Sequence, residues 1–95
     1  MGSFTRYLED HSSPEYQGIL KSLNHYEFIA SGIRTGAFDE EIFKRMFYSI
    51  LVMDWHALSG FVAEIRVKNN KSTLFQEFEW LGKRWENRPL KQENP

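Results

Sequence analysis

The chain has 95 residues, 12 of them basic and 13 acidic, and it contains no cysteine. This length predicts a single domain, residues 1–95. The near-neutral charge argues against a dedicated nucleic-acid binder, which needs a basic face against phosphates, and the absence of cysteine excludes disulfides and thiolate metal sites.

Residues 1–12 are expected to form an N-terminal arm, in which Phe4, Tyr7 and Leu8 have the spacing of a short helical turn. A long helix follows and runs to about Arg34. Ser13 suits its N-cap and Pro14 its first helical position. Gly36 is expected to end this helix, since glycine adopts the left-handed conformation without strain.

A second helix is predicted to open at Asp39 with an N-cap acid and to run to about Leu58. Its apolar arc is wide, so we expect a central helix that is contacted from more than one side. The pair Ser59-Gly60 predicts a kink or a break. A further short helix is expected beyond it, with Phe61, Val62 and Ile65 as its apolar residues.

The last helix is predicted to follow a turn at residues 69–72, with Ser72 or Thr73 as its N-cap. Its apolar stripe consists of Leu74, Phe78, Leu81 and Trp85. Pro89 should stop the helix, which leaves residues 89–95 as a loose tail.

The predicted fold class is all-α, because no strand-like alternation and no hairpin turn interrupts these helical patterns. We expect a compact bundle of about four helices with a short N-terminal helical turn. Aromatic residues make up 16% of the chain, which supplies the large side chains that a short protein without disulfides needs for its core.

Three polar residues, Asn24, Glu27 and Arg34, flank the apolar stripe of the first helix. Glu27 and Arg34 are too far apart to pair within one helix, but each can reach a neighbouring helix, and the segment around Trp80 is the expected neighbour. One interpretation is a structural clamp. In it Glu27 binds a Trp N–H or a backbone donor, and Arg34 caps a helix C-terminus or pairs with Glu79. The alternative is a small-ligand or enzymatic pocket, with Glu27 as acid or base and Arg34 as an anion-binding group.

The sequence contains no motif that indicates catalysis, a cofactor or a metal. None of its three histidines has a partner at the spacing of a helical metal pair, and no glycine-rich phosphate loop is present. We therefore expect no catalytic residue, no cofactor and no metal ion.

The C-terminal segment mixes rings with cations: Trp80, Lys83, Arg84, Trp85 and Arg88. Three interpretations are open: a core with a solvated rim, a protein interface, or a stacking surface for single-stranded nucleic acid. The nucleic-acid interpretation requires one continuous basic stripe formed by Lys68, Lys71, Lys83, Arg84, Arg88 and Lys91.

Three segments together form a familiar pattern: Leu23-Asn-His-Tyr-Glu-Phe-Ile-Ala-Ser-Gly-Ile-Arg34, Gly36-Ala-Phe-Asp-Glu-Glu41, and Phe75-Gln-Glu-Phe-Glu-Trp-Leu81 with Arg84-Trp85. The chain resembles small bacterial and phage-borne helical domains catalogued as domain of unknown function 4760. The resemblance implies an all-helical fold and supplies no activity. It marks as pattern-bearing positions Asn24, Glu27, Arg34, Asp39, Glu79, Trp80 and Trp85.

Many members of that family carry membrane helices ahead of the domain. This chain has no uninterrupted apolar run near the ~20 residues that span a bilayer, so we expect no membrane insertion by it. We expect a cytoplasmic protein, or one at the cytosolic face of the inner membrane if an upstream segment exists. Relatives in mobile genetic elements suggest a role in host–phage conflict.

The expected function is a non-enzymatic protein–protein interaction module. Its partner is a second copy of the chain, as a homodimer, or, in a narrower version, a bacterial defence component bound by a phage or mobile-element protein. The candidate interface consists of Phe4, Tyr7, Leu8, Trp80, Arg84 and Arg88. The pocket around Glu27 and Arg34 is the first alternative, and nucleic-acid binding by the C-terminal segment is the second.

Overall fold

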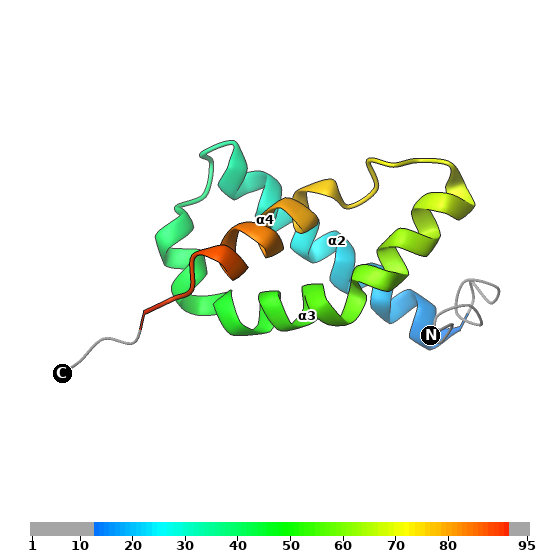
Figure 1. Cartoon of the computed structure of the whole chain (residues 1–95), viewed down its shortest axis with the longest axis horizontal. Coiled ribbons are helices and arrows are strands. Elements are labelled where there is room, and N and C mark those ends of the chain that lie inside the picture. Colours follow the sequence, from blue (N-terminus) through cyan, green and yellow to red (C-terminus); the bar gives the residue numbers. More distant parts are fainter. Residues whose placement is uncertain (1–12, 92–95) are drawn as a thin grey trace.

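A computed structural model describes residues 13–91, and every regular element in that range is a helix. The helices are α2 (Pro14–Arg34), α3 (Glu40–Asn69) and α4 (Gln76–Asn87) (Figure 1). The predicted all-α class is confirmed. The expected number of about four helices is wrong for the described residues, because the predicted second and third helices are one. The turn predicted at Phe4, Tyr7 and Leu8 lies outside the described residues.

Helix α2 begins and ends at the residues that its sequence indicates. The Ser13 hydroxyl accepts a hydrogen bond from the Tyr16 N–H at 3.1 Å, and Pro14 opens the helix. Beyond Arg34, Gly36 has a φ of +85°, which glycine adopts without steric cost. The chain then folds back, and the Phe38 ring packs so close to Gly32 that a Cβ there would lie 2.2 Å from a ring carbon.

Helix α3 continues through Ser59 and Gly60, so the predicted break is absent. A single glycine inside a helix costs only about 1 kcal/mol relative to alanine. Phe61 and Val62, which follow directly, are buried in the core and hold the helix in place. The predicted change of direction is visible in Figure 1, where the yellow-green last part of α3 runs at an angle to its middle.

The other end of α3 closes with Asn70 in the left-handed conformation, at a φ of 52°. The Lys71 N–H donates to the Arg66 carbonyl at 3.0 Å, which satisfies one of the free carbonyls of the last turn. Helix α4 begins at Gln76, after Phe75 with a φ of 57°, and Phe75 makes no side-chain cap. The prediction that Ser72 or Thr73 caps this helix is therefore wrong, since both precede its true N-terminus by several residues.

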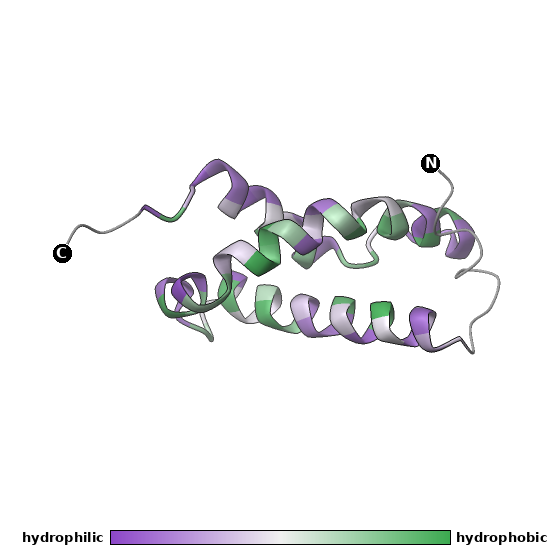
Figure 2. Ribbon diagram, turned by 90° about the horizontal axis from the view of Figure 1, so that it is seen from below, coloured by the Kyte–Doolittle hydropathy of each residue, from purple (hydrophilic) through white to green (hydrophobic). Residues whose placement is uncertain are grey.

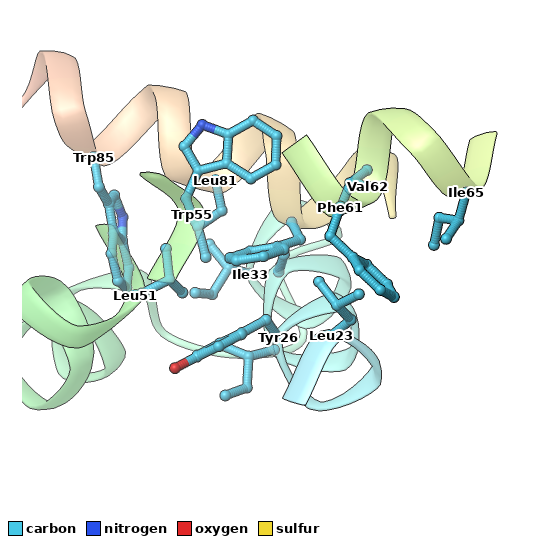
Figure 3. Close-up of a cluster of buried hydrophobic side chains, with 13 residues drawn as sticks. Leu23, Tyr26, Ile33, Leu51, Trp55, Phe61, Val62, Ile65, Leu81 and Trp85 are labelled. Atoms are coloured by element: carbon cyan, nitrogen blue, oxygen red, sulfur yellow. The ribbon is translucent and has the colours of Figure 1, made fainter. Parts of the chain in front are cut away.

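The core lies where α4 packs between α2 and α3. Figure 3 shows side chains from all three helices meeting there. The largest of those that are fully buried are Leu23, Leu51, Phe61, Val62, Phe78, Leu81 and Trp85. Gly82 lets α4 approach closely, since a Cβ there would lie 2.6 Å from the Trp55 ring.

The short α4 packs against both α2 and α3. Helix α3 is contacted from two sides, by α4 and by α2, where the Tyr16 ring lies against Phe61 and Tyr26 donates a hydrogen bond to Asp54, as its wide apolar arc predicts. Figure 2 shows hydrophobic and hydrophilic residues mixed along α2, α3 and α4, with no helix uniformly apolar. Each helix buries one side against the others. For α3 this leaves part of its wide apolar arc facing away from the core.

Candidate functional site

Glu27 caps the N-terminus of α4 from a different helix. Its Oε1 accepts the Phe78 backbone N–H at 2.9 Å, and its Oε2 accepts the Glu77 N–H at 3.3 Å. The first N–H groups of a helix have no partner within it, and the positive end of the helix dipole favours a carboxylate there. The half-buried Glu27 therefore supplies the cap that the residues next to α4 lack.

Arg34, the last residue of α2, also contacts α4. Its Nη1 is 3.3 Å from Oε1 of Glu77, and its guanidinium lies 5.0 Å from the centre of the Trp80 ring. Arg34 therefore pairs with Glu77, and neither with Glu79 nor with a helix C-terminus. The guanidinium is exposed, so this ion pair contributes little to stability on its own.

Glu79 has other partners. It accepts from Nη1 of Arg66 at 2.9 Å and from Nζ of Lys83 at 2.7 Å. These hydrogen bonds, the one from Lys83 first, lower the pKa of Glu79 below its ordinary value, while partial burial opposes them. The Nε of Arg66 also donates to the Leu74 carbonyl at 2.8 Å. Arg66 thus ties the loop before α4 to the end of α3.

Glu40, the first residue of α3, binds side chains from the C-terminal half of α4. It accepts from Nε and Nη2 of Arg84 at 2.7 and 3.0 Å, and from the indole N–H of Trp85 at 2.9 Å. The hydrogen bond from Arg84 is the main reason that the pKa of Glu40 lies below its ordinary value; Trp85 and nearby positive charges add to it, and partial burial opposes it. The sequence indicates Glu40 only as a first-turn carboxylate, because its partners lie 44 and 45 residues away.

A side-chain hydrogen bond also joins α2 to α3. The Tyr26 hydroxyl donates to Oδ2 of Asp54 at 2.5 Å, and it lies at the edge of the core cluster in Figure 3. Burial raises the pKa of Tyr26, and the hydrogen bond and negative charge of Asp54 raise it further. His56, two residues on, pairs instead with Glu86 at 2.6 Å.

The four candidate clamp residues do not converge on one site. Glu27 is engaged by backbone N–H groups, Arg34 by Glu77, and Glu79 by Arg66 and Lys83. Asn24 is exposed on α2 and lines an open hollow of about 530 Å³ together with Lys21, Ser22, His25, Tyr26 and Phe28. Between residues 13 and 91, no three acidic, histidine or cysteine side chains are grouped so that they could hold a metal ion.

Only three of the six candidate interface residues, Trp80, Arg84 and Arg88, lie in the part of the chain that the structure describes. Phe4, Tyr7 and Leu8 lie outside the described residues. Trp80 is half-buried, with the guanidinium of Arg84 5.5 Å from its ring centre in addition to that of Arg34. Arg88 is exposed, and its carbonyl accepts a hydrogen bond from Nζ of Lys44.

The large apolar side chains that are exposed lie mainly on α3. Ile42, Met46, Ile50 and Met53 are exposed by 56, 66, 47 and 62%. Their spacing of three and four residues places them on one side of the helix. We call these four residues the α3 stripe. They belong to the wide apolar arc of the second predicted helix, and a helical pattern alone does not tell which part of such an arc has a neighbour.

A row of aromatic rings leads from α2 to this helix. Phe28 contacts Phe38 edge-on at 5.3 Å between ring centres, Phe38 stacks on Phe43 at 5.0 Å, and Phe43 stacks on Phe47 at 5.9 Å. Phe28 is 66% exposed, and Phe43 and Phe47 are half-buried. The rings fix the first turns of α3 against the loop and thereby hold the stripe in place.

By length and composition, α3 qualifies as a helix able to cross a membrane. Its most apolar stretch of 18 residues has a mean hydropathy of 1.3 and is 22% buried. The sequence contains no uninterrupted apolar run of this length, because polar residues such as Asp54 lie within the helix. The high hydropathy arises because α3 carries apolar residues on its core side and on its outward side alike.

A family model described as "Domain of unknown function (DUF4760)" matches residues 3–85. The chain belongs to the DUF4760 family. The match covers α2, α3 and α4 as far as Trp85, so it includes the Glu27 and Glu40 contacts and the whole α3 stripe. No curated protein and no solved structure matches this DUF4760 chain.

Proposed function

We propose that this DUF4760 domain is a non-enzymatic module that binds another protein through the α3 stripe. The supporting observation is the exposure of four large aliphatic and thioether side chains on one side of a helix. Contiguous exposed apolar surface on a soluble domain marks interaction sites more often than chance. Two of the four are methionines, whose flexible side chains adapt to a partner's surface.

The polar groups of the domain support this proposal over a pocket around Glu27 and Arg34. A general acid or base needs a carboxylate that is open to a substrate, whereas Glu27 already accepts two backbone N–H groups. Arg34 lies on Glu77 and Trp80. The same contacts stabilise the helix junction, and we assign them that structural role.

The arrangement of the basic residues favours a protein-binding function over nucleic-acid binding. Lys83 pairs with Glu79 and Arg84 with Glu40, so at least two of the six cations are already neutralised. Figure 1 shows the yellow loop after α3, which contains Lys71, at the opposite end of the molecule from the red segment that contains Lys91. A protein that tracks a phosphate backbone needs a continuous basic surface.

Photo-crosslinking tests the proposal directly, because two of the three methionines of the chain, Met46 and Met53, belong to the stripe. The protein is produced in its native host with a photoreactive methionine analogue and irradiated there. We expect a covalent adduct of one defined mass, either with a second copy or with another protein. The adduct should disappear in a variant with Met46→Leu and Met53→Leu, which keeps the apolar surface but removes the reactive groups.

A second variant separates binding from labelling. Ile50→Glu keeps both methionines and places a charge in the middle of the stripe, so it should also abolish the adduct. Val67→Glu is the matched control, because Val67 is 82% exposed and lies on the last turns of α3, away from the stripe. The proposal is contradicted if no adduct forms, or if the adduct persists in Ile50→Glu.

A further inference from the structure

We infer that the partner of the α3 stripe is a second copy of this chain, packed antiparallel along the middle of α3 about a two-fold axis between residues 51 and 52. The inference rests on the proposed function and specifies its partner. A two-fold interface uses the same surface on both copies, so that surface must be complementary to itself. The outward side of α3 meets this condition in charge and in the sizes of its side chains.

The first observation is the scarcity of unpaired charge. From residue 46 to residue 60, the residues that α-helical spacing places on the outward side of α3 are Met46, Ser49, Ile50, Met53, His56, Ala57 and Gly60. Only His56 of these is ionisable, and it pairs with Glu86. Asp54, at the edge of this side, accepts a hydrogen bond from Tyr26. A second copy therefore meets no like charge at the centre of the contact.

The second observation is a gradient of size along that side. Large side chains occupy its N-terminal half, with Ile42 and Met46, and small ones its C-terminal half, with Ala57 and Gly60. In an antiparallel pair about the stated axis, Met46 of one copy lies opposite Ala57 of the other. Ile42 approaches Gly60 in the same way, and Ile50 lies opposite Met53. Large residues then meet small ones, which is the arrangement that lets two helices interlock. A parallel pair would set large against large and small against small.

The third observation is the available area. From their exposed fractions, the four stripe residues offer roughly 400 Å² per copy, so a symmetrical pair buries about 800 Å² from them, against the ~1,200 Å² at which specific interfaces begin. Ser49, Ala57 and Gly60, which are exposed, bring the area closer to that lower bound. An interface of this size is typical of weak association, and we expect a dimer whose formation depends on concentration in the micromolar range or above.

The absence of cysteine in the native sequence allows a clean test of orientation. One sample carries Met46→Cys and a second carries Ala57→Cys, and each is oxidised alone and after mixing. In the antiparallel pair, the two copies of residue 46 lie about 16 Å apart along the helix axis, too far for a disulfide. Residue 46 of one copy and residue 57 of the other lie side by side. We expect the mixed disulfide to form about ten-fold more than either symmetrical one.

Exchanging a large and a small side chain between positions 46 and 57 tests the same pairing independently, through the self-association of the protein without crosslinks. Ala57→Met should weaken self-association about ten-fold, because it sets two large side chains against each other. Combining it with Met46→Ala should restore association, since each pair again joins one large and one small residue. Within one chain these positions are 11 residues apart on the same helix, so the rescue cannot arise inside a monomer.

Three results would overturn the inference. The first is a symmetrical disulfide between the two Met46→Cys copies, which indicates a parallel pair. The second is the absence of rescue in the double variant. The third is a wild-type monomer at millimolar concentration. If that monomer still gives a stripe-dependent photo-adduct with a different protein, the proposed function stands and only its partner changes.

Discussion

Glu27 on α2 and Phe78 on α4 are joined by a hydrogen bond of 2.9 Å between a carboxylate oxygen and a backbone N–H, across 51 residues of sequence. Helix α4 has only 12 residues, a length at which isolated helices are marginal in water. Its N-cap position is occupied by Phe75, which makes no side-chain cap. A residue on another helix therefore supplies the cap, and the start of α4 depends on α2 being in place.

Replacing this carboxylate should destabilise the whole domain. Glu27→Ala leaves the N–H groups of Glu77 and Phe78 without their acceptor, and we expect a loss of about 1–2 kcal/mol in the free energy of unfolding, as for other lost helix caps. Urea unfolding followed by circular dichroism measures it. Glu15→Ala, at an exposed carboxylate in the first turn of α2, is the control and should cost less than about 0.5 kcal/mol. Equal losses in both variants would show that Glu27 acts only through its charge.

Glu40 should make stability depend on pH. Its pKa in the folded protein lies below the ordinary value because it accepts hydrogen bonds from Arg84 and Trp85. A carboxyl group with a lowered folded pKa stabilises the fold above its unfolded pKa, and the stabilisation is lost as pH falls through the folded pKa. Glu40→Gln should therefore reduce the free energy of unfolding at pH 7 by about 1 kcal/mol.

The same variant should lose this difference on acidification. Below the folded pKa of Glu40, wild type and Glu40→Gln both present a neutral group to Arg84, so their stabilities should converge. Unfolding midpoints measured from pH 7 down to pH 2 test this. A difference that stays constant across the range would mean that the contact depends on shape and not on charge.

Two glycines in helices should respond in opposite ways to the same substitution. Gly82→Ala places a Cβ 2.6 Å from the ring of the buried Trp55, and we expect a loss of about 1–3 kcal/mol from overpacking. Gly18→Ala meets no atom within 4 Å on an exposed face of α2, so it should gain about 0.5–1 kcal/mol from helix propensity. Thermal unfolding of both variants gives the comparison. A stable Gly82→Ala variant would mean that α4 does not approach Trp55 this closely.

The sequence predicts the parts of this fold that depend on neighbouring residues. Ser13 and Asp39 are N-caps as predicted, and Gly36 has the positive φ that its position after α2 requires. Each of these features arises from the conformation of a few adjacent residues, which composition and spacing reveal. At Ser59-Gly60 the same local reasoning predicts the change of direction but not the continuity of α3, because burial of Phe61 outweighs the cost of a glycine.

The parts that depend on distant residues are not visible in the sequence. Glu40 has the sequence context of any first-turn carboxylate, and only the packing of α4 against α3 brings Arg84 and Trp85 to it. Ile50 and Met53 likewise fit a core pattern as well as an exposed one. Whether an apolar residue is buried depends on which helices exist to cover it, and a short α4 covers only one side of α3.

The most direct test of the account is to make the α3 stripe polar and to measure stability and mass together. We expect the double variant Ile50→Gln with Met53→Gln to unfold within about 0.5 kcal/mol of the wild type at dilute concentration, because both side chains face solvent there. Light scattering should show the wild type approaching twice the monomer mass as concentration rises, while the variant stays a monomer. A variant that loses several kcal/mol would contradict the claim that this face of α3 serves contact and not folding. A wild type and a variant of equal mass at every concentration would contradict its pairing with a second copy.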